Sequence, residues 1–222
     1  MNIVILIVFG IVLFGSLTIC RRWKESFFLI AFAIGCACNA NYFNSFSAPV
    51  NFANMVFSVD SILYTMFLFT IALKFFNYPL NETKGMIFAS IVAIIISAFI
   101  ELFATLTISG LTLDSFKVFI RYILSAIGSL LAIFVMILYL NRAEKRNANR
   151  YLSLVVAIFI GSILNSACYY GINAIISSER IDNFLSIFLG SAIGKTYATI
   201  LSLLSYLIYE KFLKKKDEIR DN

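Results

Sequence analysis

The chain has 222 residues, of which 61% are hydrophobic and 14% charged, and its mean hydropathy is +0.91. A water-soluble core cannot bury so much apolar surface, so a soluble globular protein is excluded and lipid must be the solvent. Histidine is absent, which excludes histidine-based metal sites and triads. Backbone groups in lipid must bond internally, and the apolar runs are far longer than barrel strands. The chain is therefore predicted to be an all-α integral membrane protein.

Seven apolar segments follow one another along the chain, each near or above the roughly 20 residues that a spanning helix needs. They are residues 3–20, 26–47, 51–73, 86–108, 118–140, 151–177 and 184–210. The connections between them are short and polar, and they contain both prolines, Pro49 and Pro79. The first segment has no basic start and is followed by Arg21 and Arg22, so we expect an uncleaved helix. We predict one transmembrane domain over residues 1–222 with seven transmembrane helices.

Basic residues alternate strongly between the two sides of this predicted bundle. Fourteen of the 18 Lys and Arg residues flank one side, within residues 21–24, 74–84, 142–150 and 211–220. Only Lys117, Arg121 and Arg180 flank the other side. The positive-inside rule then predicts a multi-pass protein of the cell (inner) membrane with its N-terminus outside and its C-terminus in the cytoplasm. The net charge of +6 is mostly this topology signal and gives no reason to expect nucleic acid. The basic tail is expected to lie against anionic lipid headgroups.

Polar residues recur at helical spacings of three and four in six of the seven segments. Segment 184–210 carries Ser191, Lys195, Thr199, Ser202, Tyr206 and Tyr209. Segment 151–177 carries Ser162, Asn165, Tyr169 and Asn173. Segment 26–47 carries Asn41 and Asn44, and segment 51–73 carries Asn54, Ser58, Ser61 and Thr65 beside Asp60. Segment 86–108 carries Ser97, Glu101 and Thr105. The stripe of segment 118–140 begins just before it and consists of Lys117, Arg121 and Ser125. Because polar faces turn away from lipid, we predict six core helices with a polar interior and a peripheral first helix.

Three charged residues, Asp60, Glu101 and Lys195, lie within apolar segments. A charge at that depth costs at least about 2.5 kcal/mol, so Lys195 is expected to point inward with Asp60 or Glu101 as its partner. The candidate residues for binding a solute are Asp60, Glu101, Asn165, Lys195 and Asn41. For the individual Ser and Thr residues, hydrogen bonding between helices is the more common role.

No enzymatic motif is present, since the chain has neither a phosphate-binding glycine loop nor a nucleophile elbow. We expect no metal and no cofactor. The connections on the cytoplasmic side are too short for an ATP site, so a separate energy-coupling partner would have to supply one. The expected partners are such a protein or further copies of the chain. The four cysteines, Cys20, Cys36, Cys38 and Cys168, lie in or beside apolar runs and are expected to be reduced thiols.

From about Phe14 to Lys215 the chain resembles the queuosine precursor transporter family, also called the VUT family. The stretches that carry the resemblance are "LFGSLTICRRWKESFFLIAFAIGCACNANYFN", "NRYLSLVVAIFIGSILNSACYYGINAII" and "SAIGKTYATILSLLSYLIYEKFLKK". The residues that stand at matching places are Arg150, Ser153, Asn165, Ser166, Lys195 and Tyr206. The chain departs from the family at Thr70, Lys74, Phe76 and Asn77, where members usually have Asp, Glu and Tyr-Gly, and at Asn165, where they have an acid.

The resemblance implies a fold related to the substrate-binding components of energy-coupling-factor vitamin transporters. In those proteins an Ala-x-x-x-Ala stripe on the first core helix docks the coupling protein, and Ala33 and Ala37 stand on the equivalent helix here. The leading hypothesis is therefore a transporter that takes up a small nucleobase-like or vitamin-like solute.

Two other hypotheses stay open. The alternative is a non-transporting signalling or assembly protein of the membrane, whose polar stripes only join helices. A retinal protein is suggested by seven helices with a lysine in the last, but the single tryptophan, Trp23, lies in a connection and cannot form an aromatic cage. A large polar cavity would favour transport, and a filled bundle would favour the alternative.

Overall fold

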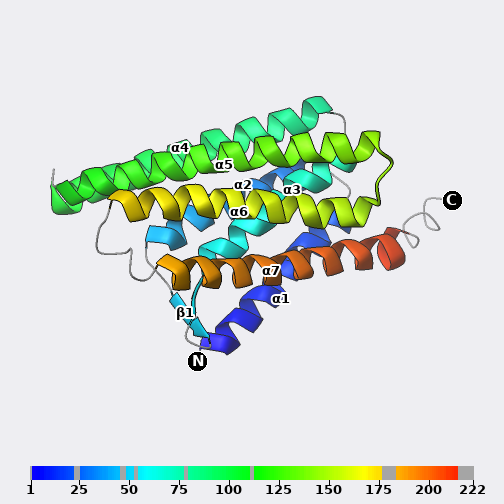
Figure 1. Cartoon of the computed structure of the whole chain (residues 1–222), viewed down its shortest axis with the longest axis horizontal. Coiled ribbons are helices and arrows are strands. Elements are labelled where there is room, and N and C mark those ends of the chain that lie inside the picture. Colours follow the sequence, from blue (N-terminus) through cyan, green and yellow to red (C-terminus); the bar gives the residue numbers. More distant parts are fainter. Residues whose placement is uncertain are drawn as a thin grey trace.

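A computed structural model describes residues 2–22, 26–45, 49–52, 55–77, 80–110, 113–176 and 184–214. In this part the chain is a bundle of helices that run broadly along one long axis (Figure 1). The helices are α1 (Asn2–Arg22), α2 (Ser26–Ser45), α3 (Val59–Asn77), α4 (Leu80–Ser109), α5 (Leu113–Lys145), α6 (Arg150–Ile176) and α7 (Phe184–Ile208). A π-helical segment, Tyr209–Lys214, continues α7.

Five helices in the described part are long and apolar enough to cross a membrane. The spans are Val59–Asn77, Thr83–Ala104, Ala126–Lys145, Arg150–Gly171 and Phe188–Phe212. Large apolar side chains are exposed along the outer faces of these helices, as with Phe88, Phe134 and Leu152. So much exposed apolar surface fits a lipid environment and would be unfavourable in water. The chain is therefore a helical membrane protein with several spans.

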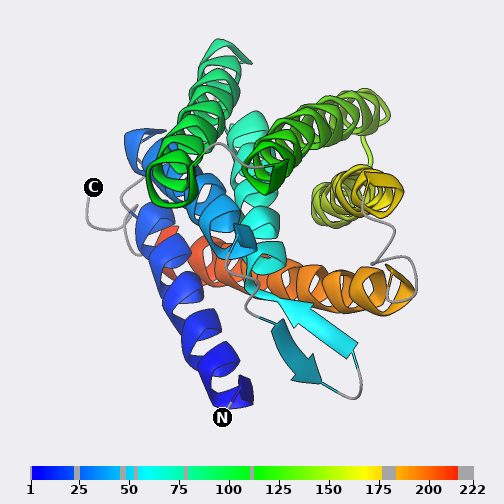
Figure 2. The ribbon, with the colours of Figure 1, turned by 90° about the vertical axis from the view of Figure 1, so that its left-hand side faces the viewer.

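The predicted start of the third helix, at residue 51, is wrong. Strands β1 (Pro49–Phe52) and β2 (Met55–Ser58) form an antiparallel hairpin here, and α3 begins only at Val59. Both strands are rich in the β-branched and aromatic residues that favour extended backbone, and Pro49 stands at the first strand position, where proline is tolerated. Figure 2 shows the hairpin beside α7. Ser58 is consequently not part of the helical stripe, and Asn54 lies outside the described residues.

Helix α3 is the centre of the bundle. Every residue from Ser61 to Lys74 is buried, and α3 contacts α2, α4, α5, α6 and α7 (Figure 2). A helix that is apolar on all sides is expected in such a position. The helices around it are exposed on their outer faces, so α3 fixes the positions of the polar side chains that face it from α6 and α7.

Helix α1 packs along α7. A Cβ added at Gly10 would overlap the Tyr197 hydroxyl, so glycine is what allows the close approach. Thr18 and Ser205 share a hydrogen bond of 2.7 Å between their hydroxyl oxygens. The opposite face of α1 is exposed and apolar.

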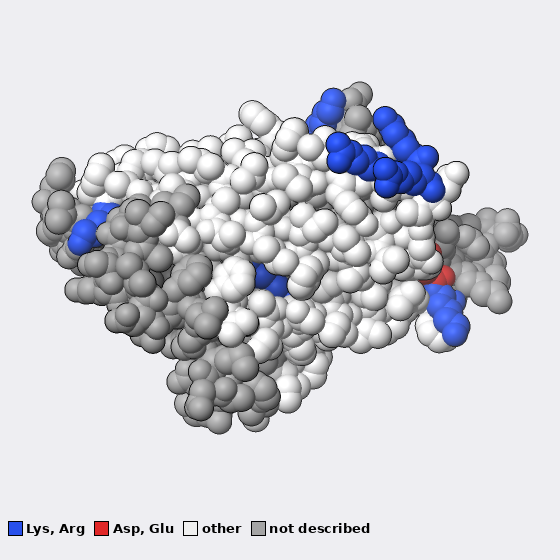
Figure 3. All heavy atoms as spheres, viewed as in Figure 1, with Lys and Arg blue, Asp and Glu red and all other residues white. Residues whose placement is uncertain are grey.

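Lys and Arg residues gather at one end of the long axis, where α5 ends and α6 begins and where α7 ends (Figures 1 and 3). The described basic residues of these segments are Arg142, Lys145, Arg146, Arg150 and Lys211.

Several helices also continue past their apolar runs, since α5 covers Leu113–Lys145 where the sequence predicted 118–140. The added turns are polar and extend the helix beyond the apolar band.

Candidate functional site

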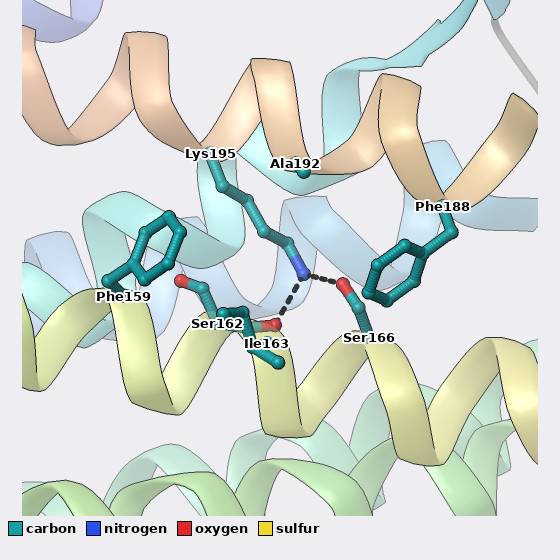
Figure 4. A pocket seen from close by; sticks show the side chains of 7 residues that line it. All are labelled: Phe159, Ser162, Ile163, Ser166, Phe188, Ala192 and Lys195. Carbon is teal, nitrogen blue, oxygen red and sulfur yellow. Dashed lines mark hydrogen bonds between the residues drawn. The ribbon is translucent and has the colours of Figure 1, made fainter. Parts of the chain in front are cut away.

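Lys195 is the centre of the candidate site. It lies on α7, and only 5% of it is exposed. Its Nζ donates hydrogen bonds to the carbonyl oxygen of Ser162, at 2.9 Å, and to the Ser166 hydroxyl, both on α6 (Figure 4). Ser162 and Ser166 are one turn apart, so both face α7. Two of the three ammonium N–H groups are therefore used within the described part of the chain.

A chain of serine hydroxyls continues from Lys195 toward the central helix. The Ser166 and Ser191 oxygens are 3.3 Å apart, and the Ser191 and Ser61 oxygens are 2.9 Å apart. All three side chains are buried. Ser191 precedes Lys195 by one turn on α7, so the two share a face. The network thus joins α3, α6 and α7 through hydroxyl groups and one ammonium group.

Asp60 gives the network a negative charge. It lies in the first turn of α3, where the helix dipole favours a carboxylate, and it is partly buried. Its charge interacts with that of Lys195, and it is also close enough to act on Tyr170 of α6. The structure thus brings Asp60 and Lys195 into one electrostatic site between α3, α6 and α7.

A small pocket, with room for about one water molecule, lies between α6 and α7. The residues that line it are Phe159, Ser162, Ile163, Ser166, Phe188, Ala192 and Lys195 (Figure 4). Its polar groups are the ammonium and the two serines, and the rest of its wall is apolar. Ser162 is 2% exposed, and its hydroxyl has no hydrogen-bond partner among the residues that the structure describes. A buried hydroxyl without a partner costs about 1–3 kcal/mol, and this oxygen has almost no surface open to the pocket.

Asn165 is buried on a different side of α6. Its Nδ2 donates to the Ser129 hydroxyl of α5 at 3.5 Å. Gly128 makes this approach possible, since a Cβ there would lie 3.2 Å from Cβ of Cys168 and 3.6 Å from Asn165 Nδ2. Asn165 is not among the residues that line the pocket.

Tyr64 of α3 connects these two groups of residues. The Lys195 ammonium lies 5.9 Å from the centre of its ring, and its hydroxyl lies beside Ser129 and Asn165. The sequence reading missed Tyr64 because tyrosine is common in apolar segments. The spacing offered a signal, since Tyr64 follows Asp60 by four residues and therefore lies on the same face of the helix.

Two further predicted site residues have a described backbone only. Glu101 lies in α4 and Asn41 in α2, but their side chains are outside the part of the structure that is described. Of the five candidates, the structure places the side chains of three, and two of these, Asp60 and Lys195, are close enough for their charges to interact.

The proposed docking stripe on α2 is not at the surface. Ala33 and Ala37 are 0% and 2% exposed, and both belong to the hydrophobic core. Small side chains allow α2 to pack closely against its neighbours, chiefly α3. The expectation that these alanines dock a coupling protein is therefore wrong for this arrangement.

All four cysteines are free thiols.

Two residues that support the family resemblance lie at the basic end of the bundle. Arg150 donates a 2.6 Å hydrogen bond to Oδ1 of Asn77, which fastens the start of α6 to the end of α3. Tyr206 of α7 packs against Tyr151, with 5.6 Å between ring centres. The guanidinium of Arg21 lies 4.8 Å from the centre of the Tyr206 ring. This end of the bundle is held together by aromatic and cationic side chains.

Comparison with known proteins adds no relative. No protein-family model matches the chain, and neither the curated proteins nor the solved structures give a significant match. The geometry of the Lys195 site and the sequence resemblance are therefore the grounds on which a function is proposed.

Proposed function

We propose that this chain is a membrane transporter that takes up a small nucleobase-like or vitamin-like solute, as its resemblance to queuosine precursor transporters suggests. The observation that carries the proposal is the buried ammonium of Lys195, which lies on a pocket midway along a membrane-spanning helix. Charged residues at this depth are expensive and usually mark a solute or ion path. Lys195 would donate a hydrogen bond to the solute, and Asp60 would balance the charge.

The proposal includes an arrangement in the membrane. Seven spans would form a core of six helices with a polar interior, and α1 would lie at the periphery against α7. The basic end would face the cytoplasm, with the N-terminus outside. The gathering of Lys and Arg at one end supports this orientation (Figure 3). Glu101, Asn165 and Asn41 complete the proposed solute-binding set, and the expected partners are an energy-coupling protein or further copies of the chain.

A second function is favoured by a different observation. The hydroxyls of Ser61, Ser191 and Ser166 contact one another, and Ser166 also accepts a bond from Lys195. Hydrogen bonds of this kind join membrane helices without any transport. The pocket also has room for only about one water molecule, far less than the roughly 300–1,000 Å³ of most ligand sites. On this view the chain is a non-transporting signalling or assembly protein.

Uptake measurements separate the two functions. Labelled nucleobases and vitamins would be supplied to cells that express the wild-type chain, a Lys195→Met variant or a Thr196→Val variant. Thr196 is a matched control because it is exposed on α7, and its hydroxyl donates a hydrogen bond to Ala192 O of its own helix. Transport predicts uptake of at least one solute by wild type and Thr196→Val, and its loss in Lys195→Met. No uptake of any solute by well-expressed wild-type protein would contradict the proposal.

A further inference from the structure

The side chains between Lys195 and α3 form a continuous chain of hydrogen bonds. The Lys195 ammonium donates to the Ser166 hydroxyl of α6 (Figure 4), whose oxygen lies 3.3 Å from that of Ser191. The Ser191 oxygen in turn lies 2.9 Å from that of Ser61, in the first turn of α3. These serines are at most 3% exposed, so bulk water does not compete for the bonds.

The links of this chain work in either direction. In both contacts between serines, either oxygen can be the donor. A hydroxyl has one proton to give and two lone pairs that accept one. A row of hydroxyls therefore passes a proton along when each group accepts one proton and releases its own. Such a row needs a group that gives a proton at one end and a group that takes it at the other.

Tyr170 of α6 extends the chain to a carboxylate. Its hydroxyl lies beside those of Ser61 and Ser191, and the charge of Asp60 acts on it. A tyrosine hydroxyl also both donates and accepts. Asp60 lies in the first turn of α3, at the end opposite to Asn77 and the basic residues, and it is partly exposed. The chain thus leads from an ammonium midway along α7 to a carboxylate near the other end of the bundle.

We propose that this chain is a proton path through which Lys195 exchanges its proton with Asp60 and, by way of Asp60, with the outer side of the membrane. The ammonium gives one proton to the chain. Ser166, Ser191 and Tyr170 each accept one proton and release their own, and the carboxylate takes up the last. The products are a neutral amine and a neutral carboxyl group, and the step needs no other reactant.

The low dielectric of the membrane favours a transfer of this kind. An isolated buried charge is very costly, whereas opposite charges stabilise each other. The transfer removes both charges together, so neither Lys195 nor Asp60 is left as an isolated ion. The other titratable side chains described around them are Tyr64, Cys168, Tyr169 and Tyr170. Phenol and thiol groups are uncharged at neutral pH, so the proton belongs to the ammonium and the carboxylate.

The small pocket beside Lys195 fits this role. It has room for about one water molecule, and Phe159 and Ile163 in its wall are exposed on the outer face of α6. Figure 3 shows the basic atoms of this region midway along the bundle, surrounded by uncharged residues. A proton moves along hydrogen bonds without any space of its own. The apolar surroundings therefore insulate the path from the lipid instead of blocking it.

In a transporter the path supplies the coupling ion, a role that rests on the proposed function and deepens it by naming the energy source. Protons arrive from the outer side through Asp60, and the solute that binds at Lys195 enters together with a proton. The proton gradient across the membrane then drives uptake.

Hydrogen exchange at the Lys195 ammonium tests the path. The full chain, prepared with isotope-labelled lysine, is placed in detergent micelles, and NMR follows the replacement of the ammonium protons by deuterium from the solvent. Loss of the signal in a Lys195→Arg variant assigns it. Ser191→Ala removes the middle of the chain and Tyr170→Phe removes the link beside Asp60. Each should slow the exchange at least about tenfold, because a proton must then cross a gap.

Two matched controls remove the same atoms outside the chain. Ser129→Ala takes a hydroxyl from an equally buried serine that bonds Asn165, and Tyr169→Phe takes one from the residue beside Tyr170. Both should exchange like wild type. If the serines only join helices, Ser191→Ala loosens the bundle and exchange stays the same or becomes faster. That result in a folded Ser191→Ala or Tyr170→Phe protein, or equal slowing in the controls, would overturn the inference.

The inference and the proposed function can fail separately. Proteoliposomes that hold a pH-sensitive dye would be supplied with the labelled nucleobases and vitamins, and uptake by wild type should acidify their interior. Uptake without acidification would remove the coupling role and keep the transporter. Slowed exchange in both chain variants, without uptake of any solute, would keep the proton path and remove the transport function.

Discussion

The guanidinium of Arg21, at the end of α1, lies 3.6 Å from the carboxylate of Glu210, just beyond α7. The same guanidinium lies over the rings of Tyr206 and Tyr209, at 4.8 and 4.6 Å from their centres. Arg21 is only 6% exposed, so these contacts are shielded from solvent. The first and last helices are thereby fastened together at the basic end of the bundle.

Replacing Arg21 by alanine should weaken the contact between α1 and the end of α7. The change removes the ion pair with Glu210 and two cation–aromatic contacts, and we expect a loss of about 2 kcal/mol, since Glu210 is partly exposed. Thermal unfolding in detergent measures the effect. Arg22→Ala is the matched control, because Arg22 is the exposed neighbour on the same turn, and it should change little. Equal melting temperatures for the two variants would contradict the role given to Arg21.

The contact between α1 and α7 depends on Gly10. A larger side chain there meets the hydroxyl of Tyr197 and the side chain of Leu201, so Gly10→Leu should cost about 1–3 kcal/mol by overpacking. Gly15→Leu serves as control, because within the described residues no other part of the fold comes within 4 Å of a Cβ at that position. Proteolysis of α1 in the folded protein would report its release. If Gly10→Leu and Gly15→Leu resist protease equally, α1 does not pack as described.

A peripheral α1 also makes a deletion testable. A chain that lacks the residues before Ser16 should still insert and fold its remaining helices, because the buried centre of the bundle is α3. Some stability should be lost with the buried contact of Leu13. Size-exclusion chromatography of the purified variant gives the answer, and an aggregated product from normal expression levels would argue against a peripheral role.

Lys195 and Asp60 should show coupled effects on stability. Lys195→Met alone leaves Asp60 without its opposite charge and is expected to cost about 3–5 kcal/mol. Adding Asp60→Asn should restore most of this stability. If Lys195 also binds the solute, uptake will not return with it. A single Lys195→Met protein that is stable and fully active would show that the ammonium has neither role.

The orientation in the membrane can be measured directly. A reporter fused after Asn222 should be active only in the cytoplasm, and one fused at Asn2 only outside, because the basic end of the bundle is expected to remain on the cytoplasmic side. A reporter within the connection between α5 and α6, at Ala148, should behave like the C-terminal one. Opposite results at Ala148 and Asn222 would mean that the number of spans between them is odd, which would contradict the two spans expected from α6 and α7.

The sequence pattern predicted the helices well where polar residues had a clear period. The stripe from Ser191 to Tyr209 is buried along its length, because spacings of three and four fix one face of a long helix. The hairpin at 49–58 was missed because its apolar residues run directly into α3 and hide the boundary. Hydrophobicity alone does not distinguish a short apolar strand from the first turns of a helix.

The spacing of the polar residues on α6 could not show which of them face α5 and which face α7. Ser162 and Asn165 belong to one apparent stripe, yet Lys195 contacts Ser162 and Ser129 contacts Asn165. Successive residues turn by about 100° around a helix, so Asn165 and Ser166 point in clearly different directions. Ser166 faces α7 and Asn165 faces α5, and only the packing of the whole bundle decides which neighbour stands on each side.

The complete burial of α3 between Ser61 and Lys74 has a consequence for the order of assembly during synthesis. Helix α3 leaves the ribosome long before α6 and α7, which cover two of its sides in the finished protein. Until α7 arrives, the Ser61 hydroxyl lacks Ser191 as its partner. A nascent chain that stops before Phe184 thus exposes polar groups of its central helix within the bilayer, a feature by which membrane quality control can distinguish an unfinished bundle from a finished one.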